Sequence, residues 1–210
     1  MERILVIGGT GLVGSEILRQ ASAEPSIKVI HALLRRPLPA SLKHTKIQEH
    51  IVDFSALDSN ADYFAVDAVI CSLGTTIKAA GSQEAFRKVD QTYPLQIAKI
   101  ARENGAKAFY LVSAIGADAD SKFFYNRIKG ELERGLRVLG FETFVAVRPS
   151  VLLGERTEKR FAEKIGQQLG RVFPLRWRSV PASSVARKIV QEVLRGKSGA
   201  RVFENEELFK

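Results

Sequence analysis

Three polar residues in the middle of the chain have the types and the spacing needed to move a proton at a carbon–oxygen bond. Ser113 ends an apolar run, and Tyr125 and Lys129 follow in the segment YNRIK. The i, i+4 spacing places Tyr125 and Lys129 on one face of a predicted helix. A tyrosine has an unperturbed pKa of about 10, and a neighbouring ammonium favours the phenolate. A serine hydroxyl can hold a substrate oxygen beside the tyrosine. The alternative for Tyr-x-x-x-Lys alone is an ordinary surface pair on an amphipathic helix.

A glycine-rich turn near the start of the chain predicts a phosphate site. The stretch VIGGTGLVGSEIL, residues 6–18, contains either Gly9-x-Gly11-x-x-Gly14 or Gly8-x-x-Gly11-x-x-Gly14. It follows a predicted strand and opens a predicted helix, which is the context of a dinucleotide-binding turn. Glycine lets the backbone approach a pyrophosphate closely, and the helix N-terminus attracts its charge. The residues expected to bind the cofactor here are Gly8, Gly9, Thr10, Gly11, Leu12, Val13 and Gly14. The alternative is a tight turn without a ligand.

The ends of later strands suggest which dinucleotide binds. Arg35 and Arg36 follow the second apolar run, where NAD-binding proteins usually carry an acidic residue. Because a guanidinium suits a phosphate, NADP(H) is predicted to bind in preference to NAD(H). These arginines could instead simply end the strand in solvent. Asp53 could accept a bond from the adenine amino group, or could cap a turn. The segment Leu73, Gly74 and Thr75 is expected near the ribose, with a plain loop as the alternative.

Strand-like and helix-like segments alternate through most of the chain. Near-continuous apolar strands separated by helices indicate a parallel sheet covered on both faces. The predicted strands are residues 3–8, 28–35, 46–52, 67–74, 107–117, 142–150 and 200–203, and the predicted helices are residues 12–23, 83–104, 122–139, 158–170 and 180–194. The expected fold is therefore a doubly wound α/β domain of the Rossmann kind. Residues 1–210 form one domain, in which 151–210 contribute a small C-terminal substrate lobe.

Composition narrows the function classes further. The chain is 45% hydrophobic and 26% charged, carries a net charge of +9 and has one cysteine, Cys71. No apolar run is long enough to span a bilayer, and Glu2 and Arg3 leave no room for a secretory leader, so a cytoplasmic location is expected. The basic excess in the second half predicts a solvated surface or attraction of a phosphate-bearing ligand; no nucleic-acid motif accompanies it. The histidines show no metal-ligand spacing, so no metal is expected.

Three longer stretches of the sequence carry a resemblance to a known family. FRKVDQTYPLQIAKIARENGAKAFYLVSAIGAD, FFYNRIKGELE and VAVRPSVLLGER resemble the short-chain dehydrogenase/reductase family, and most of all its small atypical members of the Tat-interacting oxidoreductase group. The resemblance implies that Tyr125 is the catalytic acid/base, Lys129 its activator and a ribose ligand, and Ser113 the holder of the substrate oxygen. It also implies that Pro149, Ser150 and Val151 lie beside the nicotinamide, and that a homodimer is possible. Asp90 stands where many members carry asparagine.

These patterns favour one function and leave others open. The first hypothesis is an NADP(H)-dependent oxidoreductase that transfers hydride between nicotinamide and a small carbonyl or alcohol substrate. The second is a non-catalytic regulatory protein that senses NADP(H) and binds a protein partner. An isomerase of sugar nucleotides with bound cofactor is a third, disfavoured by the short substrate lobe.

Overall fold

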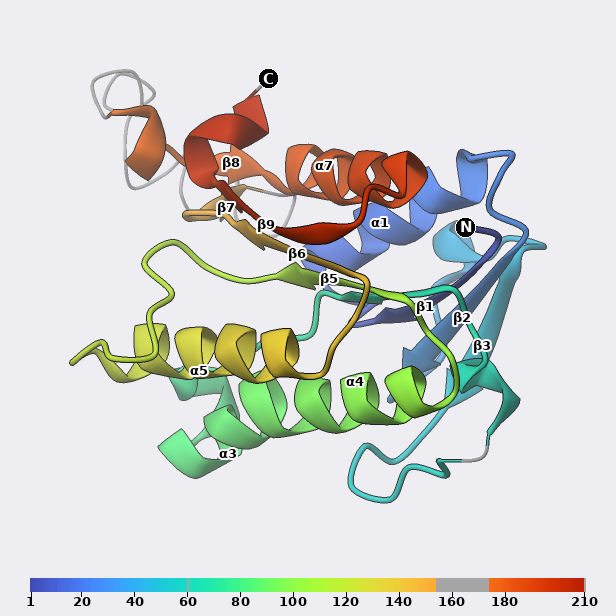
Figure 1. The fold of residues 1–210 in the computed structure, drawn as a ribbon, viewed down its shortest axis with the longest axis horizontal. Coiled ribbons are helices and arrows are strands. Elements are labelled where there is room, and N and C mark those ends of the chain that lie inside the picture. Colours follow the sequence, from blue (N-terminus) through green and yellow to red (C-terminus); the bar gives the residue numbers. More distant parts are fainter. Residues whose placement is uncertain (60, 154–173, 210) are drawn as a thin grey trace.

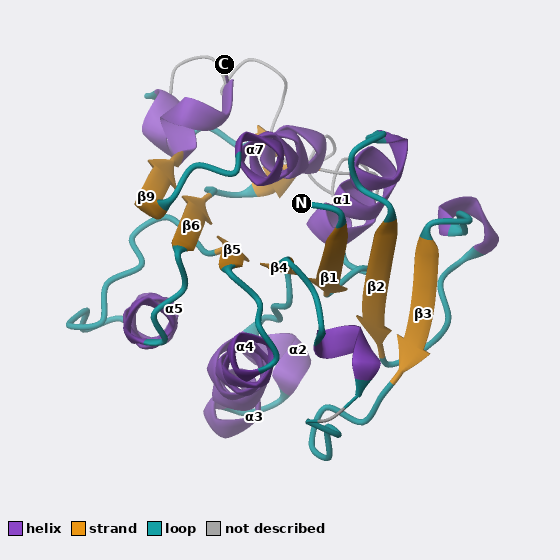
Figure 2. Cartoon of the chain, turned by 45° about the vertical axis from the view of Figure 1, so that its right-hand side comes forward, coloured by secondary structure: helices purple, strands orange, loops and turns teal. Residues whose placement is uncertain are grey.

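A seven-stranded parallel sheet organises the protein. The computed structural model describes residues 1–59, 61–153 and 174–209. The strands run in the order β3-β2-β1-β4-β5-β6-β9, and every neighbouring pair is parallel. They are β1 Arg3–Ile7, β2 Val29–Leu34, β3 Ile47–Ile51, β4 Ala68–Cys71, β5 Ala108–Val112, β6 Thr143–Arg148 and β9 Gly199–Glu204. Figures 1 and 2 show helices on both faces of this sheet, so the predicted doubly wound fold is confirmed.

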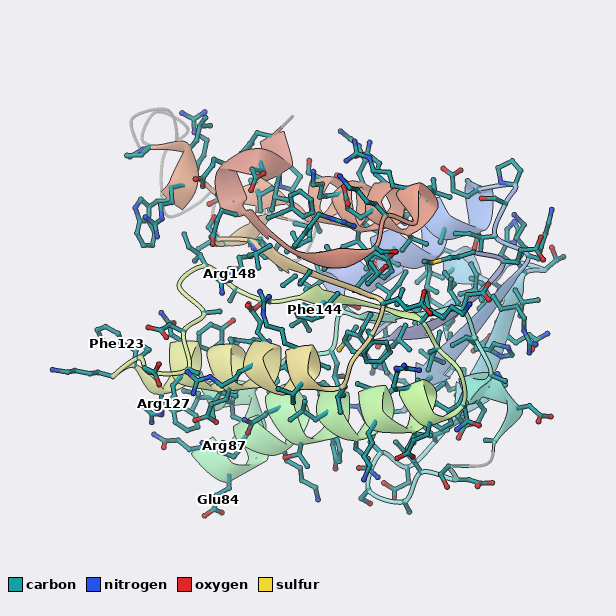
Figure 3. All side chains as sticks on the ribbon, in the orientation of Figure 1. Glu84, Arg87, Phe123, Arg127, Phe144 and Arg148 are labelled. Atoms are coloured by element: carbon teal, nitrogen blue, oxygen red, sulfur yellow. The ribbon has the colours of Figure 1, made fainter. Side chains whose placement is uncertain are left out.

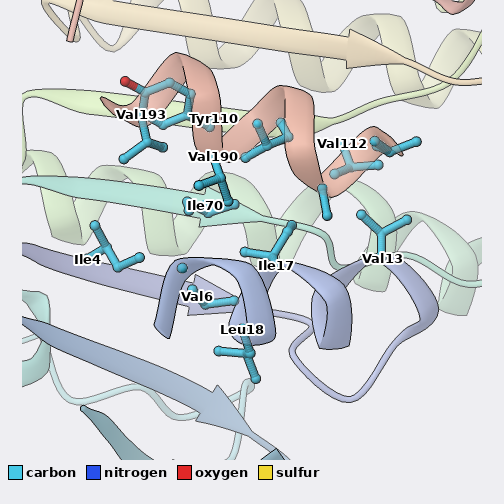
Figure 4. Close-up of a cluster of buried hydrophobic side chains, with 14 of the residues drawn as sticks. Ile4, Val6, Val13, Ile17, Leu18, Ile70, Tyr110, Val112, Val190 and Val193 are labelled. Carbon is cyan, nitrogen blue, oxygen red and sulfur yellow. The ribbon is translucent and has the colours of Figure 1, made fainter. Parts of the chain in front are cut away.

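Two apolar cores hold the helices against the sheet. On one face α1 (Leu12–Ala23) and α7 (Ala182–Arg195) lie side by side, and on the other lie α4 (Tyr93–Glu103) and α5 (Phe124–Val138). Figure 4 shows the first core, where strand residues such as Val6 and Ile70 meet Ile17 of α1 and Val190 of α7. Because the central strands contribute buried side chains to both cores, their sequences are apolar at nearly every position.

The order of the strands reverses at β1. From β1 the chain runs outward through β2 to β3, then returns to place β4 on the other side of β1. In open parallel sheets, ligands bind beyond the carboxyl ends of the strands at such a switch point. The segments after β1, β4, β5 and β6 share this edge, and they carry most of the predicted site residues.

The long helix predicted over residues 83–104 is interrupted. It divides into α3 (Gln83–Arg87), a π-helical segment Lys88–Thr92 and α4. Pro94 lies in the first turn of α4, directly after the π-helical segment. The π-helical segment was not predicted, because nothing in KVDQT distinguishes it from an α-helix.

The C-terminal region contributes more to the main domain than expected. In the predicted lobe, 151–210, α7 packs against α1 and β9 adds the last strand of the main sheet. This corrects the extent of the lobe, since an amphipathic helix and a strand find their apolar partners on the existing layers. Outside those layers lie the two short strands β7 (Leu152–Leu153) and β8 (Val180–Pro181) and the turn Leu175–Trp177. The helix predicted over 158–170 falls outside the described residues.

Candidate functional site

The glycine turn after β1 is fixed by backbone contacts that exclude side chains. Gly8 has a φ of +84°, and a Cβ atom there would lie 2.6 Å from the carbonyl carbon of Ser72. A Cβ atom on Gly14 would lie 2.1 Å from the carbonyl oxygen of Gly8. A Cβ atom on Gly9 would meet only the flexible side chains of Leu18 and Leu34. Of the two possible spacings, Gly8-x-x-Gly11-x-x-Gly14 therefore describes the turn.

Helix α1 begins at this turn with its first amide groups free of side-chain caps. Gly11 occupies the N-cap position and makes no side-chain hydrogen bond, and the first turn contains no acidic residue. The Gly11 amide itself bonds to the carbonyl oxygen of Gly8, 2.9 Å away. Uncapped amide groups and the positive end of the helix dipole suit a phosphate. Together with the close glycine packing, these features fit a dinucleotide pyrophosphate.

The residues predicted to select the dinucleotide lie after β2 and β3. Arg35 and Arg36 are exposed just beyond the end of β2. Asp53 accepts hydrogen bonds from the backbone amide and the hydroxyl of Ser55, at 2.8 and 2.7 Å. These bonds hold the pKa of the Asp53 carboxyl below its ordinary value. One Asp53 oxygen is thus committed to its own turn, which is the local role considered as the alternative to adenine binding.

The segment after β4 lies directly against the predicted proton-transfer residues. A Cβ atom on Gly74 would lie 3.3 Å from Oδ1 of Asp90 and 3.7 Å from Nζ of Lys129. The Thr75 amide donates a 2.8 Å hydrogen bond to Oδ2 of Asp90. Leu73 is only partly buried. The sheet edge therefore brings Gly74 and Thr75 to Lys129, although they are more than fifty residues apart in the sequence.

Lys129 is a buried cation with a buried partner. Its Nζ lies 2.7 Å from Oδ1 of Asp90, and the two side chains are only 4% and 1% exposed. Burial alone would lower the pKa of the ammonium, but the negative charge of Asp90, with smaller contributions from Tyr125 and Cys71, raises it above its ordinary value. Lys129 is thus held in its charged form at the carboxyl edge of the sheet.

Tyr125 lies one helical turn before Lys129 and faces more open surroundings. It is 37% exposed, and its ring packs against Phe86 of α3 with 5.6 Å between the ring centres. At the outer end of the preceding turn, Phe123 is 76% exposed, and Arg127 lies nearby on α5 (Figure 3). Tyr125 is therefore reachable by a small molecule, whereas the ammonium that acts on it is buried.

Ser113 follows β5 and its hydroxyl is already engaged. It donates a hydrogen bond to Oε1 of Glu133, with 2.5 Å between the oxygens. Glu133 is 3% exposed and is held by Arg148, whose Nε and Nη2 lie 3.0 and 2.8 Å from its two oxygens. Arg148 also bonds to Glu204 of β9. Because the Ser113 proton is donated to a carboxylate, its oxygen can take part in a further hydrogen bond only as an acceptor.

Close packing fixes the loop after β5 against α5. A Cβ atom on Gly130 would lie 2.1 Å from both the backbone nitrogen of Ala119 and the carbonyl carbon of Asp118. The Asp118 amide also bonds to the carbonyl oxygen of Asn126 at 3.1 Å. The glycine after Lys129 therefore lets the loop from Ser113 and the helix that carries Tyr125 approach each other.

The segment Pro149, Ser150 and Val151 follows β6 at the same edge. The Ser150 amide donates to Oδ1 of Asn205, and its hydroxyl donates to the carbonyl oxygen of Arg178. Asn205 is fully buried and also donates to the carbonyl oxygens of Leu175 and Arg178. Val151 is 49% exposed. This segment is thus fastened by Asn205 to the turn that contains Trp177.

Three functional neighbours were not predicted as such. Asp90 was noted only as a departure from asparagine, and Glu133 and Asn205 were not singled out. Glu133 carries a signal that could have been used, since Tyr125, Lys129 and Glu133 recur every four residues along one helix face. Asp90 and Asn205 carry no such signal, because their partners are distant in sequence.

Two other buried titratable groups are not among the predicted site residues. Cys71 is fully buried in β4 within an apolar core, and burial raises the pKa of its thiol to about 11. His31 of β2 lies 2.9 Å from His50 of β3, and burial, then the charge of His50, lowers its pKa to about 4. Within the described ranges, no group of three or more His, Cys, Asp and Glu side chains could hold a metal ion.

The fold and the site together define a Rossmann domain for a nicotinamide dinucleotide. The chain belongs to the NAD(P)H-binding family, whose model matches residues 8–195. It is 35% identical to the protein FMP52, mitochondrial, of Candida albicans over 92% of this chain and 89% of that protein. It is 32% identical to the protein HTATIP2 of Rattus norvegicus over 93% of this chain and 83% of that protein.

A solved structure shows the same fold. An oxidoreductase of the short-chain dehydrogenase/reductase family from Burkholderia thailandensis superposes with a TM-score of 0.71 at 19% identity, over 99% of this chain and 92% of that one. With the family and the relatives, this confirms the predicted membership among the atypical short-chain dehydrogenases/reductases, near HTATIP2.

The expected cytoplasmic location is corrected by the same comparisons. The FMP52 relatives of Candida albicans and of other fungi carry "mitochondrial" in their names. The cytoplasmic expectation rested on reading neither a secretory leader nor a membrane-spanning run in the sequence, and that reading does not distinguish the cytoplasm from mitochondria. In the part of the chain that the structure describes, no helix has the length and apolar character to cross a membrane.

Proposed function

We propose that this protein is an NADP(H)-dependent oxidoreductase that transfers hydride between nicotinamide and a small carbonyl or alcohol substrate. The observation that carries the proposal is the buried Lys129 ammonium, held beside the Gly74 turn and one helical turn from Tyr125. It lies at the same sheet edge as the uncapped N-terminus of α1. A cation placed between a nucleotide-binding turn and a reachable tyrosine suits cofactor binding and proton transfer together.

The residues at this edge fit a nicotinamide dinucleotide. The glycine turn from Gly8 to Gly14 and the first amides of α1 would hold its pyrophosphate, and Arg35 and Arg36 would bind the extra phosphate of NADP(H). Lys129 and the Gly74 turn would contact the ribose, and residues 149–151 would lie beside the nicotinamide. When bound, the cofactor supplies the hydride donor or acceptor.

The chain's own side chains would manage the proton. Tyr125 would give its phenolic proton to the oxygen of a carbonyl, or take one from an alcohol. The positive charge of Lys129, one helical turn away, would stabilise negative charge that develops during proton transfer in either direction. The Ser113 oxygen, whose own proton is donated to Glu133, would accept a hydrogen bond from the hydroxyl of an alcohol or of Tyr125.

Tyr125→Phe tests the catalytic assignment. General acid–base catalysis contributes about 100-fold or more to a rate. We therefore expect at least this loss of NADPH oxidation with a panel of small aldehydes and ketones, and an unchanged dissociation constant for NADPH. Tyr93→Phe, on the neighbouring α4, is the matched control and should keep wild-type turnover. Activity that survives Tyr125→Phe would remove the tyrosine from the mechanism.

A second candidate is a non-catalytic regulatory protein that senses NADP(H). One observation favours it: the Ser113 hydroxyl and the Lys129 ammonium are each already bound to a carboxylate. If the protein only senses the cofactor, NADPH should bind tightly while no carbonyl compound in the panel accelerates its oxidation.

A further inference from the structure

Asp90 joins three separate parts of the candidate site. It lies in the π-helical segment Lys88–Thr92 and is fully buried. One carboxylate oxygen meets Lys129 of α5 at 2.7 Å, and the other accepts the Thr75 amide at 2.8 Å. A residue on a short helical turn thereby connects α5 to the segment after β4.

The π-helical segment explains how a charged residue comes to lie there. A π-turn inserts an extra residue into a helix and changes which side chains face inward, and such turns occur frequently at functional sites. In this protein the segment falls between α3 and α4 and directs Asp90 toward the sheet edge, where it is 1% exposed. A buried carboxylate is costly unless a charge and hydrogen bonds satisfy it, and Lys129 and Thr75 supply both.

Among the described residues, few other charged groups act on Lys129. The groups that act on it are Asp90 from the π-helical segment, Tyr125 from its own helix and the Cys71 thiol from β4. Burial raises the pKa of that thiol, so it carries no charge near neutrality. The carboxylate of Glu133, one helical turn after Lys129, is already hydrogen-bonded to Ser113 and Arg148. Within the described part of the chain, Asp90 is therefore the one full negative charge among the groups that act on Lys129.

We propose that Asp90 is a positioning residue that keeps Lys129 protonated and fixes it against the Gly74–Thr75 turn, where the cofactor ribose is proposed to bind. Its role in turnover rests on the proposed function, but its effect on Lys129 does not. Without this carboxylate the buried lysine would lose its main stabilising charge, and burial would favour the neutral amine. The neutral amine would then present no positive charge to the proton-transfer site.

The test is a direct titration of Lys129 in the full-length protein without cofactor. The 13Cε resonance of each lysine reports its protonation, and the Lys129→Met spectrum assigns the signal of interest. In the wild type, Lys129 should not lose its proton at a lower pH than the exposed Lys99 does, although Lys129 is buried. In Asp90→Asn, which keeps an oxygen for the Thr75 amide, the Lys129 midpoint should fall by about one pH unit or more.

Controls separate this effect from general loss of charge and from misfolding. Glu131→Gln removes a carboxylate from the same helix, one that pairs with Arg87 at the surface, and should leave the Lys129 midpoint unchanged. If Asp90→Asn does not fold, the titration midpoints of Lys129 and Lys99 in the wild type still test whether the buried lysine stays protonated. The proposal is overturned if, in the wild type, the titration midpoint of Lys129 lies at a lower pH than that of Lys99. It is also overturned if the Lys129 midpoint is the same in the wild type and in a folded Asp90→Asn variant.

The outcome of this titration is independent of the outcome of the test of the proposed function. Failure of NADPH to bind would remove the oxidoreductase proposal and leave the Lys129 titration unaffected. An unchanged Lys129 midpoint would remove the role of Asp90 and leave NADPH binding to be measured by itself.

Discussion

The two halves of the candidate site are built by different means. Around β1 and α1 the geometry depends on the absence of side chains, since Gly8 and Gly14 let backbone segments come together. Around β5 and α5 it depends on buried charges, since Lys129 meets Asp90 and Glu133 meets Ser113 and Arg148. The first half is suited to a ligand that brings its own charge. The second is suited to moving a proton.

Gly14→Ala should produce the largest effect, because it disrupts the close backbone packing of the glycine turn around β1 and α1. The new methyl group would lie 2.1 Å from the carbonyl oxygen of Gly8, which cannot move without the turn. We expect a loss of more than about 3 kcal/mol in the free energy of unfolding, measured with urea, and no measurable NADPH binding.

Gly11→Ala is the matched control for this change. Its methyl group would meet only the Gly8 oxygen, at 3.1 Å, and its φ of −79° suits alanine. Stability should therefore stay within about 1 kcal/mol of the wild type. Equal destabilisation by both substitutions would contradict the account of the turn.

Glu133→Ala should be the most damaging single change in the charged half. It removes the acceptor of the Ser113 hydroxyl and leaves Arg148, whose side chain is only 22% exposed, without its main partner. Breaking a buried ion pair in this way costs about 3 kcal/mol, which urea denaturation would measure. Glu131→Ala, two residues earlier and paired at the surface with Arg87, should cost less than about 1 kcal/mol.

Local patterns in the sequence predicted one part of this site, and contacts between distant residues form the other part. The glycine turn and the Tyr125–Lys129 pair are local patterns, so both were found, as was the alternation of strands and helices that defines the fold. The contacts of Asp90 with Lys129, and of Asn205 with Ser150, join residues 39 and 55 positions apart. No local pattern predicts such pairs, because they exist only after the sheet has brought the strand ends together.

A pH-dependent contribution to stability should come from His31, a buried histidine of β2 that lies outside both halves of the site. His31 has its pKa lowered from 6.5 to about 4 by burial and by His50. Between these values the unfolded chain binds a proton that the folded protein does not, so stability falls as the pH drops. We expect the wild type to lose about 2 kcal/mol between pH 7 and pH 5 through this group.

The measurement is urea denaturation at both pH values for the wild type, His31→Gln and His44→Gln. His31→Gln should lose correspondingly less stability on acidification. His44 is exposed, so His44→Gln should behave as the wild type does. If all three proteins respond alike, the pH effect does not arise at His31.

The smallest expected effect concerns the choice of cofactor. Replacing Arg35 and Arg36 together by alanine should weaken NADPH binding at least about tenfold, or ~1.4 kcal/mol, and leave NADH binding nearly unchanged. Both side chains are exposed, so the free energy of unfolding should not change. Equal losses for both dinucleotides would show that the pair does not bind the extra phosphate.

The most direct test of the central claim is calorimetric titration of the purified protein with NADPH and then with NADH. We expect one site per chain that binds NADPH more tightly than NADH, because the glycine turn would accept the pyrophosphate and the arginines would bind the extra phosphate. Binding of neither dinucleotide would contradict it, and Lys129 and Tyr125 would then need another explanation.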